Sequence, residues 1–162
     1  MNLKIHAKLP GSDFCLSSRL NLLPFAALLN KLFSKPVHVQ LETSLTLTLK
    51  QAYEQHLFAQ GWLPAILPVS ASQIRVQFNA QMKCSQGEFS FAPRDWPAFN
   101  ARLRSEPLPQ APFVNWEQSL KKMREDGHTL WYYPASGRHW VFFCKDERYC
   151  EFVMWMCEDR VA

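Results

Sequence analysis

Apolar and polar residues alternate with a period of two in two separate parts of the chain, and this pattern predicts half-buried β-strands. Over residues 74–82 one face is apolar and the other is polar. The polar segment that follows leads to a second phenylalanine-containing stretch, so residues 74–91 are predicted to form a β-hairpin with its turn at residues 84–87. The other alternating segment covers residues 37–49 and predicts a further strand.

The C-terminal part of the chain contains three aromatic-rich segments separated by short polar turns. Predicted strands cover about residues 128–134, 138–145 and 148–157. The middle segment is apolar on both faces, so it is expected to lie inside a sheet with other elements covering each side. Residues 128–157 are therefore predicted to form an antiparallel β-meander.

Apolar residues at helical spacing predict four helices. They cover about residues 22–33, 50–60, 95–104 and 115–126. Asp95 is the expected N-cap of the third helix, and Asn115 with Gln118 resembles a capping box at the start of the fourth. The third and fourth helices are the expected covers for the middle strand of the meander.

These elements predict an α+β fold, an antiparallel sheet of five or six strands with three or four helices packed on it. Residues 1–19 show no periodicity and are expected to be a flexible N-terminal arm, and residues 20–162 are expected to form a single α+β domain. A chain of 162 residues with 48% hydrophobic content can bury roughly 70% of the surface of its unfolded state. The core should therefore need no metal or other staple.

The net charge of +4 does not mark a nucleic-acid surface, because it arises in the first fifty residues. There, six basic residues stand against two acidic ones, whereas residues 51–162 carry twelve of each sign. Nucleic-acid binding needs basic residues clustered on one element, and the sequence does not predict it. No membrane span is evident, since no stretch approaches about 18 uninterrupted apolar residues. The sequence indicates no oligomeric state.

The five cysteines are an odd number without a CxxC pair, which argues against a disulfide framework and a zinc knuckle. Reduced, packed thiols are expected instead, and these favour the cytoplasm. The five histidines show no metal-binding spacing and are expected at the surface. The sequence accordingly predicts no metal site and no cofactor.

No motif of an established reaction is present, so no catalytic residue is predicted. One hypothesis is a non-enzymatic protein-binding domain, either immunity-like or accessory, which contacts another protein. Trp131, Tyr133 and Trp155 are its candidate interface residues, because Trp and Tyr on the outer face of a sheet are enriched at interfaces.

The alternative is a small enzyme or small-ligand-binding domain with a pocket near the C-terminal sheet. Its candidate pocket residues are Asp95, Arg138, His139 and Glu151. Glu151 alternates with the apolar positions of its strand, and a solvated or edge carboxylate is the expected environment.

Residues 61–74, within the segment 58–91, read Gly-Trp-Leu-Pro-Ala-Ile-Leu-Pro-Val-Ser-Ala-Ser-Gln-Ile. This stretch resembles a family of uncharacterised bacterial proteins with a G-W-L-P-x-x-(L/I)-P-x-S-A-x-x-I motif. Many members look like small proteins tethered by an N-terminal membrane helix or lipid anchor, so the resemblance implies export or tethering. It implies no activity. This chain departs from the pattern at residues 79–84, where the family is more acidic, and it lacks a convincing N-terminal span.

Overall fold

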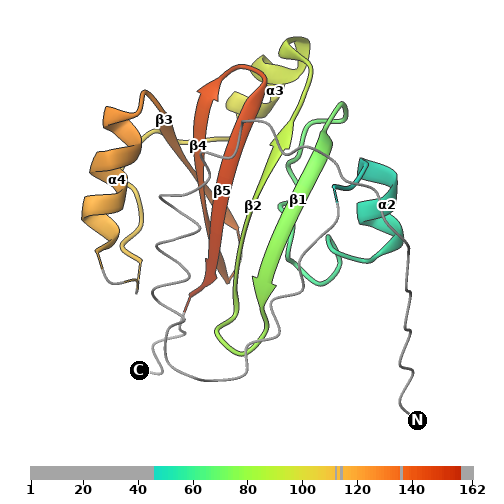
Figure 1. The fold of residues 1–162 in the computed structure, drawn as a ribbon, viewed down its shortest axis with the longest axis horizontal. Coiled ribbons are helices and arrows are strands. Elements are labelled where there is room, and N and C mark those ends of the chain that lie inside the picture. Colours follow the sequence, from blue (N-terminus) through green and yellow to red (C-terminus); the bar gives the residue numbers. More distant parts are fainter. Residues whose placement is uncertain (1–45, 112, 114, 136, 158–162) are drawn as a thin grey trace, which may run out of the picture.

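The computed structural model describes residues 46–111, 113, 115–135 and 137–157. Five strands form one antiparallel sheet in the order β1-β2-β5-β4-β3 (Figure 1). The strands are β1 (Ser72–Asn79), β2 (Cys84–Ser90), β3 (Thr129–Ala135), β4 (Arg138–Asp146) and β5 (Tyr149–Met156). The predicted α+β class, the antiparallel sheet and the C-terminal meander are confirmed.

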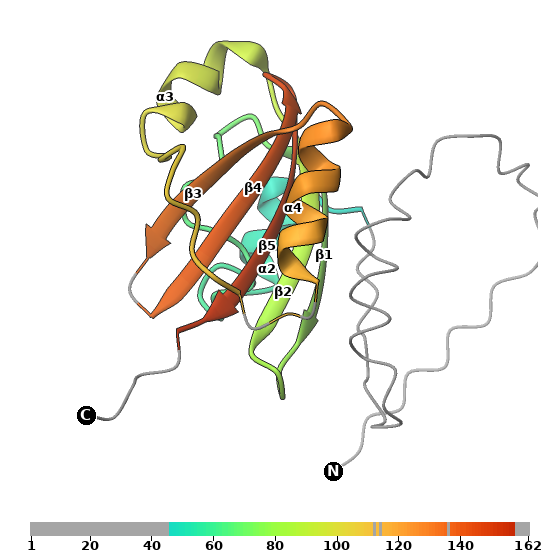
Figure 2. The same ribbon diagram turned by 90° about the vertical axis from the view of Figure 1, so that its left-hand side faces the viewer.

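Helices cover both faces of this sheet (Figure 2). The helical elements are α2 (Leu49–Glu54), the 3-10 turn η1 (Pro93–Asp95), α3 (Trp96–Asn100) and α4 (Trp116–Glu125). The larger apolar core lies on the face with α2 and α3, and the smaller one lies under α4. The sheet is therefore the middle layer of three.

Strand β4 lies between β3 and β5 and is covered on both sides, as its apolar sequence predicts. Phe142 and Phe143 are both 0% exposed although they point to opposite faces. Phe99 of α3 contacts Phe142 edge to face at 5.4 Å between ring centroids. Trp116 of α4 contacts Phe143 in the same manner at 6.4 Å. The predicted covering helices are both in place.

The hairpin of β1 and β2 is confirmed, but its turn is not where the sequence pattern put it. The paired strands end at Asn79 and Cys84, so the turn lies before residues 84–87. Gly87 lies inside β2 opposite Val76. A Cβ atom there would overlap the carbonyl oxygen of Arg75 and lie 2.7 Å from Phe152 Cζ. Glycine is thus required by close packing within the sheet rather than by a turn.

Helix α2 begins earlier and ends earlier than predicted. It starts at Leu49 because Thr48, which the sequence pattern assigns to the end of a strand, forms a capping box with Gln51. It ends at Glu54, and His56 then adopts a positive φ of 58°. A left-handed residue cannot continue a helix, so the predicted extension to residue 60 is wrong.

The two predicted helix caps also differ from expectation. Asp95 occupies the N-cap position of α3 and Asn115 that of α4, but neither side chain makes a capping hydrogen bond. Helix α3 ends at Asn100 rather than near residue 104, where Arg104 forms an isolated antiparallel bridge with Tyr132. The bridge requires extended backbone, which is incompatible with a continuing helix.

The N-terminal predictions lie largely outside the described residues. This holds for the arm at residues 1–19, the helix at 22–33 and most of the strand at 37–49. Within the described part, Leu47 forms an antiparallel bridge with Ile74 of β1 through two backbone hydrogen bonds of 2.8 and 2.9 Å.

Candidate functional site

The three candidate interface residues have different environments. Trp155 is 4% exposed and lies under α4, where its ring contacts Trp116 at a centroid distance of 5.4 Å. It therefore belongs to the core and presents no surface. Trp131 and Tyr133 are partly buried at the periphery of the larger core. Trp131 also contacts Trp96 edge to face at 6.1 Å.

More aromatic side chains surround the same core than the sequence pattern indicated. We call the partly buried aromatic residues at its periphery the aromatic rim; they are Phe58, Trp62, Phe78, Trp96, Trp131 and Tyr133. Trp62 stacks on Phe78 at 4.7 Å, and Tyr53, which is 58% exposed, stacks on Phe58 at 4.3 Å. The rim joins residues far apart in the sequence, so periodicity within one element could not reveal it.

The four candidate pocket residues are divided between the two faces of the sheet. Asp95 accepts hydrogen bonds from the backbone N–H and hydroxyl of Ser70 on the side of the larger core. The hydrogen bond from the Ser70 hydroxyl is the main reason that the pKa of Asp95 is lowered. Arg138 lies on the same side, with its guanidinium against Gly61 and 3.5 Å from the carbonyl oxygen of Gln60.

His139 and Glu151 occupy the opposite face but are separated along the sheet. His139 pairs with Trp155, four residues from Glu151 on β5, which corresponds to about 13 Å along a strand. The Tyr132 hydroxyl lies 3.1 Å from His139 Nδ1, and burial lowers the pKa of His139. The four residues therefore do not form a common pocket.

Glu151 instead belongs to a polar cluster that crosses three strands. It faces Glu88 directly in the register of β2 and β5. Tyr149 donates its hydroxyl to Glu88 Oε2 at 2.6 Å, and the Tyr149 hydroxyl oxygen also lies 3.3 Å from Glu151 Oε1. Arg75 of β1 donates to Glu88 Oε1 at 3.0 Å. Two carboxylates thus share one phenol, and only one of them has a guanidinium partner at hydrogen-bond distance.

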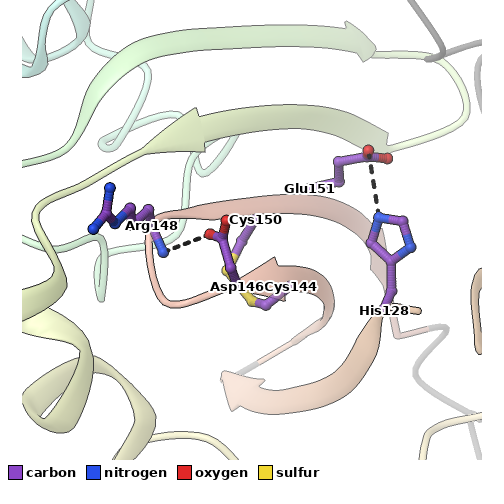
Figure 3. Close-up of a disulfide and its surroundings, with 6 residues drawn as sticks. All are labelled: His128, Cys144, Asp146, Arg148, Cys150 and Glu151. Carbon is purple, nitrogen blue, oxygen red and sulfur yellow. Dashed lines mark hydrogen bonds and ion pairs between the residues drawn. A yellow bond between two sulfur atoms is a disulfide. The ribbon is translucent and has the colours of Figure 1, made fainter. Parts of the chain in front are cut away.

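His128, in the connection between α4 and β3, extends toward Glu151 of this cluster (Figure 3). Its Nε2 lies 4.0 Å from Glu151 Oε1, and its Nδ1 lies 3.2 Å from the carbonyl oxygen of Met123. Burial lowers the pKa of His128. Burial, and then the charge of Glu88, raises the pKa of Glu151 to about 7. The contact is therefore between a neutral imidazole and a carboxyl group that is partly protonated at neutral pH.

These positions correct two expectations from the sequence. The Glu151 side chain is 16% exposed rather than solvated, and that of His128 is 9% exposed rather than at the surface. The sequence pattern missed the cluster because its members meet only through the pairing of β2 with β5, whose strands are separated by some sixty residues. The one sequence signal for the cluster is that Glu151 is a charged residue within an otherwise apolar strand.

Cys144 and Cys150 form a disulfide across β4 and β5 (Figure 3). The two residues are directly opposite in the register, with a Cα–Cα distance of 4.1 Å, and are 3% and 0% exposed. The expectation of reduced thiols is therefore wrong for this pair. Cys84 and Cys157 are free, and burial raises the pKa of the Cys84 thiol to about 11.

Replacing both Cys144 and Cys150 with Ala should lower the free energy of unfolding by roughly 2 kcal/mol, because a closed loop of this length removes little entropy from the unfolded chain. Urea denaturation of the oxidised protein and of the double variant measures the difference. Cys157→Ala is the control and should leave the urea midpoint unchanged. An equal midpoint for wild type and double variant would show that the crosslink contributes nothing.

Metal ligands and membrane-spanning helices are two further features that the described part of the chain could hold. No group of three or more His, Cys, Asp or Glu residues there could hold a metal ion. None of the described helices has the length and apolar character needed to cross a membrane.

The fold and the site define a small α+β domain whose antiparallel sheet carries a mostly buried carboxylate pair. Residues 47–90 match the model of the YbbD head domain. The match contains the segment 61–74 and supports the resemblance to an uncharacterised bacterial family. No curated protein and no solved structure matches the chain. The matched segment runs from the Leu47 bridge to the end of β2, so it supplies two of the five strands.

Proposed function

We propose that the protein is a non-enzymatic protein-binding domain, immunity-like or accessory, whose partner contacts the aromatic rim. The observation that carries this proposal is the set of partly exposed aromatic side chains around one core, with Tyr53 stacked on Phe58 at their edge. Trp and Tyr are enriched among the residues that dominate binding energy at protein interfaces. The partner is proposed to be another protein, and the product of an adjacent gene is the first candidate to test.

The disulfide supports a working compartment other than the reducing cytoplasm, because structural disulfides persist in oxidising environments. This agrees with the export that the family resemblance implies. Trapping free thiols at the moment of cell lysis, followed by denaturation and peptide mapping, tests it: label on Cys84 and Cys157 but not on Cys144 and Cys150 indicates an intact disulfide.

The binding proposal is tested with the purified product of the adjacent gene by isothermal titration calorimetry. Tyr53→Ala and Tyr133→Ala should each weaken binding by roughly tenfold or more, which is typical of a tyrosine that contributes strongly to an interface. Lys121→Ala, on the exposed face of α4, is the control and should leave the affinity unchanged. Unchanged affinity for both tyrosine variants would exclude this surface.

The alternative of a small enzyme or ligand-binding domain has less support. It required Asp95, Arg138, His139 and Glu151 to converge, and these residues lie on two faces of the sheet. Of the four, only Glu151 lies directly opposite another carboxylate, and that pair shares the Tyr149 hydroxyl as an internal hydrogen-bond partner.

A further inference from the structure

The carboxylate pair lies on the seam between two parts of the fold. Strand β2 ends the segment that matches the YbbD head domain, and β5 ends the C-terminal meander. The sheet order places β2 against β5, so these two strands alone join the hairpin to the meander within the sheet of the described residues. Glu88 and Glu151 face each other at this junction.

Charge around the pair is unevenly distributed. Arg75, from β1, contacts Glu88, and its own side chain is 48% exposed. Lys145, from β4, lowers the pKa of Glu151, but its effect is the smallest of those that act on this carboxyl group. His128, which is neutral when buried, adds no positive charge at neutral pH. Two carboxylates at directly opposite positions of a sheet repel each other when both are ionised.

The phenol between the carboxylates has one proton to donate. Tyr149 gives it to Glu88 Oε2, the nearer oxygen at 2.6 Å. The phenol has no second proton for Glu151 Oε1, which lies 3.3 Å from its oxygen, so both contacts can be hydrogen bonds at once only when Glu151 is protonated and donates to that oxygen. Chemically this is a chain from carboxylic acid to phenol to carboxylate, closed by the Arg75 guanidinium.

We propose that Glu151, Tyr149 and Glu88 form a hydrogen-bonded relay that holds one proton between two carboxylates and stabilises the β2–β5 seam in a pH-dependent manner. Ionisation breaks only the O–H bond of Glu151 and releases its proton to solvent. The relay then loses one hydrogen bond and gains a repulsive pair of charges. The seam weakens as the pH rises, and no partner protein is needed for this response.

The raised pKa of Glu151, to about 7, agrees with this arrangement, since burial and then the Glu88 charge are its leading causes. The other titratable groups nearby respond differently. Burial lowers the pKa of His128, and the nearby charge of Asp126 raises it by a smaller amount. Burial raises the pKa of Tyr149 well above its ordinary value. Glu151 is therefore the group of this cluster that changes charge as the pH passes through neutrality.

Carbon-13 NMR of the glutamate carboxyl groups in the full chain tests the relay. One carboxyl resonance, assigned by its loss in Glu151→Gln, should titrate with a midpoint near 7. In Glu88→Gln the repulsion is absent, and the proton affinity of Glu151 should fall by roughly tenfold or more. The same change at Glu117, an exposed residue of α4, is the control and should leave the Glu151 midpoint in place.

Hydrogen exchange supplies the second readout, after correction for the intrinsic pH dependence of exchange. Amides of β2 and β5 should be less protected at pH 8 than at pH 5 in wild type, and this difference should disappear in Glu151→Gln, whose neutral side chain can still donate. A Glu151 midpoint in the ordinary range of glutamate would overturn the proposal. So would a midpoint that is unaffected by Glu88→Gln, or seam protection that does not depend on pH.

Discussion

Replacing Gly87 with Ala should lower the free energy of unfolding by at least about 3 kcal/mol, because the added methyl group overpacks a closed interior. The Cβ atom would overlap the backbone carbonyl oxygen of Arg75, which cannot move without breaking the pairing of β1 with β2. It would also lie 2.7 Å from Phe152 Cζ, and Phe152 is 1% exposed. Neither the Arg75 carbonyl nor the Phe152 ring can move without a large cost in free energy.

Thermal denaturation measures the effect, and a loss of 3 kcal/mol corresponds to a decrease in Tm of roughly 10 °C for a domain of this size. Gly137→Ala is the matched control. Gly137 has a positive φ of 68°, but an added Cβ would meet no atom within 4 Å. Its replacement should therefore cost only about 1 kcal/mol of backbone strain. Equal effects at the two glycines would contradict the packing of β2 described above.

The second large effect expected is a change in how stability depends on pH when Glu151 is replaced with Gln. The folded-state pKa of Glu151, about 7, exceeds the ordinary value of 4.5 for a glutamate, so the folded state binds more protons between these limits. The free energy of unfolding of wild type should thus fall as the pH rises from 4.5 to 7, by up to about 3 kcal/mol from this group. The variant lacks that contribution.

Urea denaturation at several pH values measures this difference. Relative to wild type, Glu151→Gln should gain stability progressively as the pH rises through this interval, and the gain should level off above it. Glu117→Gln, on the exposed side of α4, should follow wild type at every pH. A constant offset between Glu151→Gln and wild type across the interval would mean that Glu151 titrates alike in the folded and unfolded states.

The sequence predicts the meander and its covers well because those signals are local. The alternation of Phe142 and Phe143 between two apolar faces is a property of one strand, and it required cover on both sides. Helix α4 and the three C-terminal strands were likewise placed to within about two residues, which is the usual accuracy of element boundaries.

Features that depend on register were missed. The disulfide between Cys144 and Cys150 was not predicted. The two cysteines lie opposite each other only because the register shifts between Cys144 and Asp146, and the sequence of the turn does not reveal that shift. The pairing of Glu88 with Glu151 depends on β2 lying beside β5, a non-local contact that no periodicity reports. Gly87 was assigned to a turn because an isolated glycine after polar residues is typical of one.

The candidate interface residues show the same contrast between local patterns, which the sequence reveals, and non-local contacts, which it does not. Alternation correctly separated the two faces of β5, but it could not tell that α4 covers Trp155. Conversely, the stacking of Trp62 on Phe78 joins the proline-bounded connection to β1, and only the fold brings them together. Aromatic content alone therefore indicated an interface without locating it.

The most direct test of the proposed function is hydrogen exchange of the protein, free and bound to the product of the adjacent gene. Binding through the aromatic rim should protect the segments around Tyr53, Trp62 and Tyr133, and should leave the amides of α4 unchanged. Protection confined to α4, or no complex at micromolar concentrations of both proteins, would contradict a partner surface on the aromatic rim.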